Sequence, residues 1–357
     1  MKSLFRGTSA VSWRYRSHVG EEFSPALQEL LNQELGTNPT TVRGLTNHLP
    51  MALVAKEALG ADDDELIRFA ASYASRIAWL DEPSNRLTTT TWQTAIGNHA
   101  AAAELRSYFL RQVAESGSDE TMRTHLPILI PGIGGGAFHG IIRLAYALEV
   151  SSPSRVAAGM AYLAEVGSPL RPLLRTHVGT QDPFEILAGL SVADDRPLPP
   201  KLKTIDEVMR VVAQSDVFDA AVASLEITED TSHKLENAAL HVFASSDNFT
   251  ALHGVTGLEA IASIRPYIDD GAHVTRHTFQ ALVAAYLSIG APPLWSKDRL
   301  DEFIVTYECD PESVRLKAAY SDDEHVSKLV YTARRSWERS NDLLYLAVAA
   351  RKTLPIP

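Results

Sequence analysis

Apolar residues recur at the spacing of an α-helix along most of the chain. In residues 62–77 they fall on one face of a predicted helix, at Leu66, Phe69, Tyr73 and Ile77. Ser24 followed by Pro25 is typical of a helix start and predicts a helix through Leu35. The same spacing predicts further helices over 98–116, 137–149, 153–165, 203–213, 231–244, 249–264, 274–289, 311–319 and 323–350.

Patterns typical of β-strands are nearly absent. The best strand prediction is the short apolar segment 128–130, which Pro127 and Pro131 flank. A connector rich in proline and aspartate covers residues 195–202 and could divide two domains. Since the motifs with reactive side chains fall on both sides of it, we expect one large all-α domain over residues 1–357, with a central and largely buried pocket.

Charge and cysteine content exclude several classes of protein. The 357 residues include 33 basic and 44 acidic side chains, which give a net charge of −11. The densest basic stretches, 14–16 and 334–335, are too short to follow a phosphate backbone, so we expect no nucleic-acid partner. Cys309 is the one cysteine, which excludes an intrachain disulfide and is typical of the cytoplasm. No segment resembles a signal peptide or a membrane span, so no membrane association is expected.

The glycine-rich segment 131–140 (PGIGGGAFHG) precedes a predicted helix. It is not a phosphate-binding P-loop, and no second strand follows it as a dinucleotide-binding fold requires. One interpretation is a helix start where absent side chains let another group approach the backbone. His139 would then lie in the first turn, with Arg143 and Tyr146 on the same face. From this segment alone, close helix packing around a hydrogen-bonded histidine is the favoured interpretation.

Three other segments place a histidine where a ligand or base could stand. His48 comes just before a predicted helix, and His253 stands beside small glycines in an apolar helix. His325 follows three acidic residues that suit a helix start, and Lys328 lies on its face at i+3. Each signal alone is also explained by a buried, hydrogen-bonded histidine or by a solvated helix end.

The other histidines share no pattern, and we expect surface or structural roles for them. These are His18, His99, His125, His177, His233, His241, His273 and His277. The chain contains neither the Gly-x-Ser-x-Gly turn of serine hydrolases nor the His-Glu-x-x-His pair of zinc proteases.

Taken in order, four segments resemble the questin oxidase-like family: 47–61 (NHLPMALVAKEALGA), 131–149 (PGIGGGAFHGIIRLAYALE), 249–261 (FTALHGVTGLEAI) and 322–335 (DDEHVSKLVYTARR). The resemblance implies an all-helical, oxygen-using enzyme that acts on a polycyclic aromatic polyketide such as an anthraquinone. It implies oxygen insertion beside a ring carbonyl, in a Baeyer–Villiger sense, or cleavage of the ring, with no flavin.

The resemblance also implies a non-haem ferrous iron held by histidines and a carboxylated lysine. Carried over by motif, these ligands are His48, His139, His253, His325 and Lys328. Imidazoles suit iron, and an oxygenase site usually adds a carboxylate. Because no segment clearly offers an Asp or Glu on the same helix face as its histidine, a carbamate on Lys328 would supply the oxygen ligand and remove the buried positive charge of the lysine. We further hypothesise that Arg143 and Tyr146 stabilise oxyanion charge during catalysis.

Two other hypotheses about the function remain open. A metal-free Baeyer–Villiger-type oxidase would use a histidine base, with NADPH as the reductant. A helical ligand-binding protein would keep the pocket without chemistry. Bound metal and oxygen consumption distinguish the three, while the oligomeric state and the exact substrate stay open.

Overall fold

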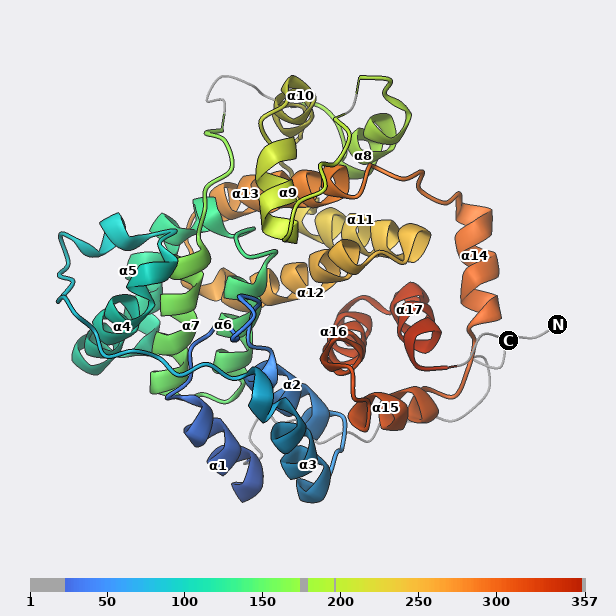
Figure 1. Ribbon diagram of the computed structural model, residues 1–357. Coiled ribbons are helices and arrows are strands. Elements are labelled where there is room, and N and C mark those ends of the chain that lie inside the picture. Colours follow the sequence, from blue (N-terminus) through green and yellow to red (C-terminus); the bar gives the residue numbers. More distant parts are fainter. Residues whose placement is uncertain (1–22, 174–178, 196, 355–357) are drawn as a thin grey trace.

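The computed structural model describes residues 23–173, 179–195 and 197–354, and these form an all-α protein (Figure 1). No β-sheet occurs within these ranges, where only isolated bridges pair extended residues. The helices are α1 (Pro25–Glu34), α2 (Leu49–Ala58), α3 (Asp63–Tyr73), α4 (Ala102–Ser116), α5 (Ser118–Leu129), α6 (His139–Glu149), α7 (Pro153–Val166), α8 (Pro183–Val192), α9 (Ile205–Val212), α10 (Asp216–Ala223), α11 (Thr231–Ser246), α12 (Phe249–Ile264), α13 (Gly271–Ser288), α14 (Lys297–Thr306), α15 (Pro311–Ala319), α16 (Glu324–Ser340) and α17 (Leu343–Thr353).

Short polar side chains fix where several helices begin. The Ser24 hydroxyl accepts the backbone N–H of Leu27 at 3.1 Å at the start of α1. Asp323 does the same for the N–H of His325 at 2.8 Å, so α16 begins one residue before that histidine. These caps satisfy donors that a helix start otherwise leaves unpaired. They confirm the helix starts expected near residues 25 and 323.

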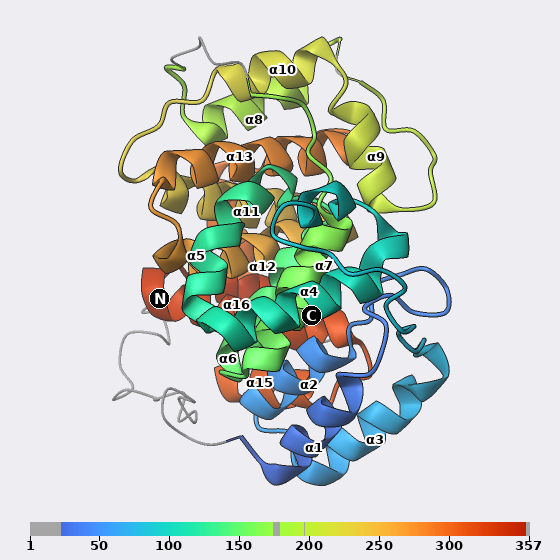
Figure 2. The ribbon, with the colours of Figure 1, turned by 90° about the vertical axis from the view of Figure 1, so that its left-hand side faces the viewer.

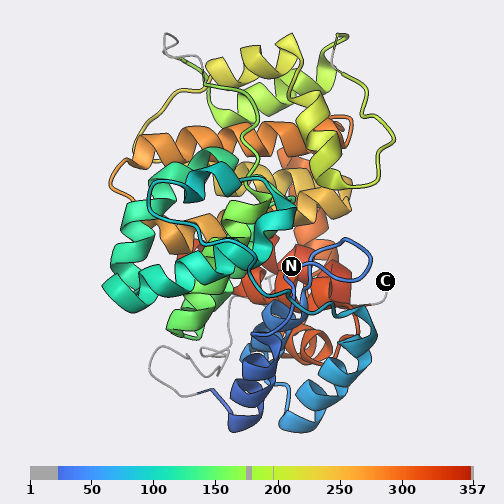
Figure 3. The ribbon, with the colours of Figure 1, turned by 60° about the vertical axis from the view of Figure 1, so that its left-hand side comes forward.

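The helices are layered along the long direction of the molecule. Helices α8, α9 and α10 lie at one end and α1 and α3 at the other, with α11, α12 and α13 between (Figures 2 and 3). Near the middle, α12 packs against both α6 and α16, and α2 packs against the same two helices. Elements from both ends of the chain therefore meet in one region, and Figure 1 shows α2, α6, α12 and α16 near the middle of the molecule.

The structure corrects several sequence-based expectations. Residues 128–130 are not a strand, because α5 continues through Pro127 and buries Met122, Leu126 and Leu129 at helical spacing. The predicted helix 323–350 is two helices, since Asn341 adopts a left-handed conformation and ends α16. The short helices α8, α10 and α14 were not expected. In the connector expected at 195–202, which lies between α8 and α9, the described residues 195 and 197–202 are not helical.

Some expectations concern residues outside the described part of the chain, namely His18, His177, the basic stretch 14–16 and residue 196 of the connector. The single-domain organisation stays a prediction. Among the described helices, none has both the length and the apolar character that crossing a bilayer requires.

The glycine-rich segment packs against the end of α7 and then directs the chain into α6. A side chain at Gly135 would collide with the backbone carbonyl of Val166. Ala137 and Phe138 both take the left-handed conformation, and α6 begins immediately afterwards at His139. Phe138 is fully buried against Gly257 of α12, where a Cβ atom would stand 2.7 Å from the phenyl group. This contact brings the start of α6 against the middle of α12.

Gly257→Ala should therefore destabilise the protein by roughly 1–3 kcal/mol, because the new methyl group overpacks the contact with Phe138. Gly254→Ala, one turn earlier in α12, is the matched control. A Cβ there would meet its nearest atoms at 3.8 and 3.9 Å, an ordinary contact. Urea unfolding of both variants checks the prediction, and equal effects of the two substitutions would contradict it.

Candidate metal centre

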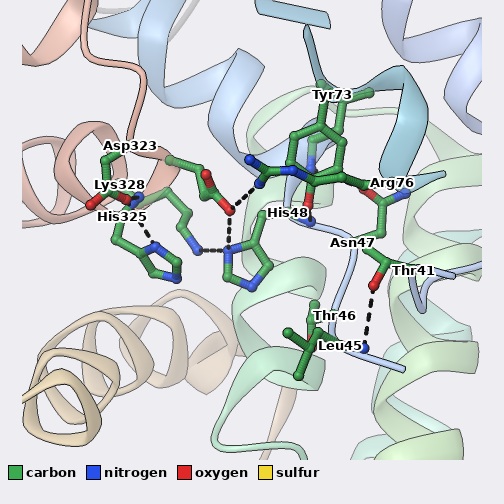
Figure 4. A network of polar contacts seen from close by, with 12 residues as sticks. Thr41, Leu45, Thr46, Asn47, His48, Tyr73, Arg76, Asp323, His325 and Lys328 are labelled. Carbon is green, nitrogen blue, oxygen red and sulfur yellow. Dashed lines mark hydrogen bonds and ion pairs between the residues drawn. The ribbon is translucent and has the colours of Figure 1, made fainter. Parts of the chain in front are cut away.

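Four histidines from four helices form a closed ring of imidazoles in the buried centre. His48 stands just before α2, His139 begins α6, His253 lies on α12 and His325 lies on α16. Around the ring, the centroid distances are 4.6 Å from 48 to 139, 4.6 Å from 139 to 253, 5.5 Å from 253 to 325 and 4.6 Å from 325 to 48. Lys328, one turn after His325, reaches the same place (Figure 4). All five residues named from the motifs are brought together.

His139 and His253 point their Nε2 atoms at each other. The Nδ1 atom of His139 is 2.6 Å from the carbonyl of Gly136, and that of His253 is 2.8 Å from the carbonyl of Phe249. Because a carbonyl only accepts, each Nδ1 must carry the proton, which leaves a lone pair on each neutral Nε2. These two Nε2 atoms are 3.2 Å apart. Two lone pairs at this distance repel unless a cation lies between them.

His325 adds a third nitrogen of the same kind. Its Nδ1 lies 3.0 Å from an oxygen of Asp323, so the carboxylate orients the ring and holds the proton there. Its Nε2 is buried and has no hydrogen-bond partner among the described residues. A buried nitrogen without a partner carries a desolvation cost, which a bound cation would remove.

His48 is held differently, in contact with Lys328 and Glu324. The Lys328 Nζ lies 3.0 Å from Nδ1 of His48, and an oxygen of Glu324 lies 3.9 Å from the same nitrogen. Arg76 pairs with that oxygen at 3.2 Å and is half exposed, so this side of the ring lies nearest to solvent (Figure 4). His48, Glu324 and His325 form a group of ligand atoms close enough to share one metal ion.

Glu324 was missed from the sequence, where no carboxylate was expected beside the histidines. It is adjacent to His325 and lies one turn before Lys328 on α16, so its i, i+4 relation to the lysine was the available signal.

Burial keeps the ring uncharged. It lowers the pKa of His139 from 6.5 to about 3, and it lowers the pKa of His48 and of His253 well below 6.5. Burial also lowers the pKa of His325, although the hydrogen bond that its Nδ1–H donates to Asp323 opposes the shift. The pKa of Lys328 falls from 10.5 to about 8 for the same reason. Neutral imidazoles are the form that binds metals.

Arg143 and Tyr146 follow His139 on α6, but they face other partners. Arg143 forms a buried ion pair with Glu34 and donates to the carbonyl of Asn47 at 3.0 Å. The ring of Tyr146 packs against that of Tyr331 at 5.8 Å. Their proposed part in oxyanion stabilisation stays a prediction.

Three described histidines outside the ring, namely His125, His277 and His99, have ordinary partners. His125 lies between the hydroxyl of Tyr108 and the carbonyl of Thr121, and His277 contacts Gln280 at 3.1 Å. Exposed His99 pairs with Glu165. These contacts agree with the structural and surface roles expected for them.

The model of one protein family, described as questin oxidase-like, matches residues 45–333. The chain belongs to the questin oxidase-like family. That match covers most of the chain and includes all four histidines and Lys328. No curated protein matches the chain.

Membership indicates an oxidoreductase of the oxygenase type that acts on a small aromatic polyketide. Among the described residues, the ring of imidazoles brings together nitrogen atoms that are suited to binding a metal ion. Three of the four histidines have their second nitrogen oriented by a carbonyl or a carboxylate, an arrangement typical of metal ligands.

Without metal, the protein should lose stability as the pH falls below about 6.5, the unfolded-state pKa of histidine. Because the folded-state pKa of His139 is about 3, the unfolded state binds more protons between these values, and stability rises with pH across that window. Urea unfolding of chelator-treated protein at about pH 7.5 and about pH 5 measures this dependence.

His139→Gln should weaken the pH dependence. His99→Gln is the control of opposite sign, because the hydrogen bond that His99 donates to Glu165 raises the pKa of His99. The hydrogen bond between His99 and Glu165 stabilises the folded protein at low pH, and this contribution is lost as the pH rises. Removing it in His99→Gln should therefore not reduce the loss of stability at low pH. Unchanged pH dependence in His139→Gln would contradict the expectation.

Proposed function

We propose that this protein is a flavin-independent oxygenase that binds one ferrous ion in the imidazole ring and uses dioxygen to cleave, or insert oxygen into, a ring of an anthraquinone-like polyketide. The observation that supports the metal most directly is the 3.2 Å separation of two Nε2 atoms whose Nδ1 atoms both donate to carbonyls. Two imidazole nitrogens bound at right angles to one metal, each at about 2.1 Å, stand about 3 Å apart.

The donor set favours iron among metals. Imidazoles with one oxygen ligand and open positions are typical of non-haem iron oxygenases. A ferrous ion held there would let dioxygen accept electrons from the aromatic substrate, so that ring cleavage with both oxygen atoms retained in the product needs no other reductant. The protein's own part is to hold the ligands unprotonated, which burial of the four histidines achieves, and to exclude water around the reacting groups.

Lys328 supplies the oxygen ligand in this proposal, as a carbamate. Its lowered pKa, about 8, gives an appreciable neutral fraction near neutral pH. The neutral Nζ forms a bond to the carbon of CO₂ and releases one proton, so the buried positive charge is replaced by a carboxylate-like anion. The carbamate oxygens accept hydrogen bonds. His48 could then carry its proton on Nδ1 and present Nε2, as the other three histidines do.

The two alternatives have less support. A metal-free oxidase needs a histidine base, and a base is most effective with a pKa near the working pH. Burial lowers the pKa of all four ring histidines, to about 3 for His139, which makes them weaker bases. A ligand-binding protein that catalyses no reaction would not need two Nε2 lone pairs, those of His139 and His253, to face each other at 3.2 Å. NADPH belongs to the metal-free alternative, and a cytoplasmic location stays part of the proposal.

Protein purified without chelator should contain about one iron per chain, and His139→Ala should lose it, because removal of one imidazole leaves the facing Nε2 of His253 alone. Elemental analysis measures the iron. The matched control is His277→Ala, since His277 is also a buried histidine with a lowered pKa but lies outside the ring. Absence of iron after anaerobic loading with ferrous ion would contradict the metal-dependent function.

Oxygen uptake tests the reaction itself. The iron-loaded protein should consume dioxygen in the presence of anthraquinones and related polyketides, and His139→Ala should not. Uptake by metal-free protein would support the metal-free alternative instead.

The oxygen ligand can be assigned by comparing two variants of α16. Lys328→Ala should lose most of the iron, whereas Glu324→Gln should keep it, since Glu324 is already paired with Arg76. A ¹³C NMR signal of a carbamate after exchange with labelled bicarbonate should appear in the wild type and disappear in Lys328→Ala. If instead Glu324→Gln lost the iron and Lys328→Ala kept it, Glu324 would be the oxygen ligand.

A further inference from the structure

His48 differs from the other three histidines in how its ring is oriented. The rings of 139, 253 and 325 each have one nitrogen held by a backbone carbonyl or a carboxylate. Within the described residues, no such oxygen lies within hydrogen-bond distance of a ring nitrogen of His48, whose one close partner is Lys328. Because Lys328 is the one close side-chain partner of the His48 ring and is itself a ligand in the proposed function, the backbone contacts of His48 contribute to its position.

The backbone around His48 is fixed on every side. The N–H of Asn47 donates to the carbonyl of Pro39 at 2.8 Å, and the N–H of His48 donates to the hydroxyl of Tyr73 at 2.9 Å. The N–H of Leu49 donates to the side-chain oxygen of Asn47 at 3.0 Å. The carbonyl of Asn47, which shares its peptide bond with the nitrogen of His48, accepts from Arg143 at 3.0 Å.

Among these contacts, the one from Arg143 connects two ligands. Arg143 lies on α6, one turn after His139, so its guanidinium joins the helix of one histidine to the peptide that positions the other. The Nη2 atom of Arg143 pairs with the buried carboxylate of Glu34. The same carboxylate also accepts a hydrogen bond from the side-chain amide of Asn47 at 3.5 Å. Both side chains of the pair are buried, so water does not compete for either.

We infer that Arg143, held by Glu34, is a positioning residue that fixes His48 relative to His139. The inference rests on the proposed function for its consequence at the metal, and on the contacts above for the geometry. It differs from the oxyanion role hypothesised from the sequence, because both guanidinium nitrogens with described contacts are directed to Glu34 and to Asn47 rather than to the ring.

Arg155 provides a matched control. It is also buried, it pairs with the other oxygen of Glu34 at 3.6 Å, and it donates to a backbone carbonyl, that of Leu31. It makes no contact with Asn47 among the described residues. Arg143→Lys and Arg155→Lys therefore both keep a positive charge beside Glu34, but Arg143→Lys alone loses the planar fork that reaches Asn47.

The test is the affinity of each variant for Co²⁺, followed by its visible absorption spectrum, which reports ligand number without turnover. Arg143→Lys should weaken binding about 10- to 100-fold and alter the spectrum, as loss of an orienting partner does elsewhere. Arg155→Lys should leave both close to wild type. Equal effects of the two variants, or no effect of Arg143→Lys, would overturn the inference.

Histidine side-chain NMR of the metal-free variants keeps this inference separate from the proposed function. With the His48 signals identified by their loss in His48→Ala, Arg143→Lys should shift or broaden them while Arg155→Lys does not. If wild-type protein binds no metal but this difference is seen, the proposed function fails and the positioning role stands. If metal binds and the difference is absent, the positioning role fails alone.

Discussion

The structure depends on the burial of four uncharged imidazoles at the point where four helices meet. Burial of a histidine costs less when a ring nitrogen has a hydrogen-bond partner, and here those partners are the carbonyls of Gly136 and Phe249, one carboxylate and one lysine. Each helix must therefore begin at the correct residue and in the correct orientation. The left-handed residues before α6 and the Asp323 cap of α16 achieve this for His139 and His325.

Buried charge ties the helices of this centre to one another and to the rest of the fold. Lys56 on α2 contacts Glu65 at 2.6 Å and the carbonyl of Ala319 at 2.8 Å, close to the start of α16. Glu259 on α12 accepts from Ser336 of α16 at 2.9 Å. Such buried groups add little net stability, because their desolvation is costly, but they favour one arrangement over near alternatives. A metal centre needs one such fixed arrangement of helices, because its ligands tolerate only small displacements.

Much of the fold could be predicted from local pattern, and less of the centre. Helical spacing and polar caps identify α1, α3 and α12, whereas the break at Asn341 depends on a left-handed residue that no apolar pattern reports. The five proposed ligands came from a resemblance, not from spacing. Glu324 escaped notice because a lone acid near a helix start usually caps or faces solvent. The carbonyls that orient His139 and His253 could not be predicted, since they belong to no side chain.

The distance along the chain between the partners of the centre has a consequence for synthesis. Lys328 and His48 contact each other although 280 positions separate them. At ribosomal rates of about 5–20 residues per second, the first histidine waits roughly 15 to 60 seconds for its partner. During that interval the apolar face of α2, which is buried in the finished protein, has no C-terminal helix to cover it. The centre is therefore completed only after α16 has been synthesised, and until then α2 can pack only against helices that precede it, such as α1 and α3.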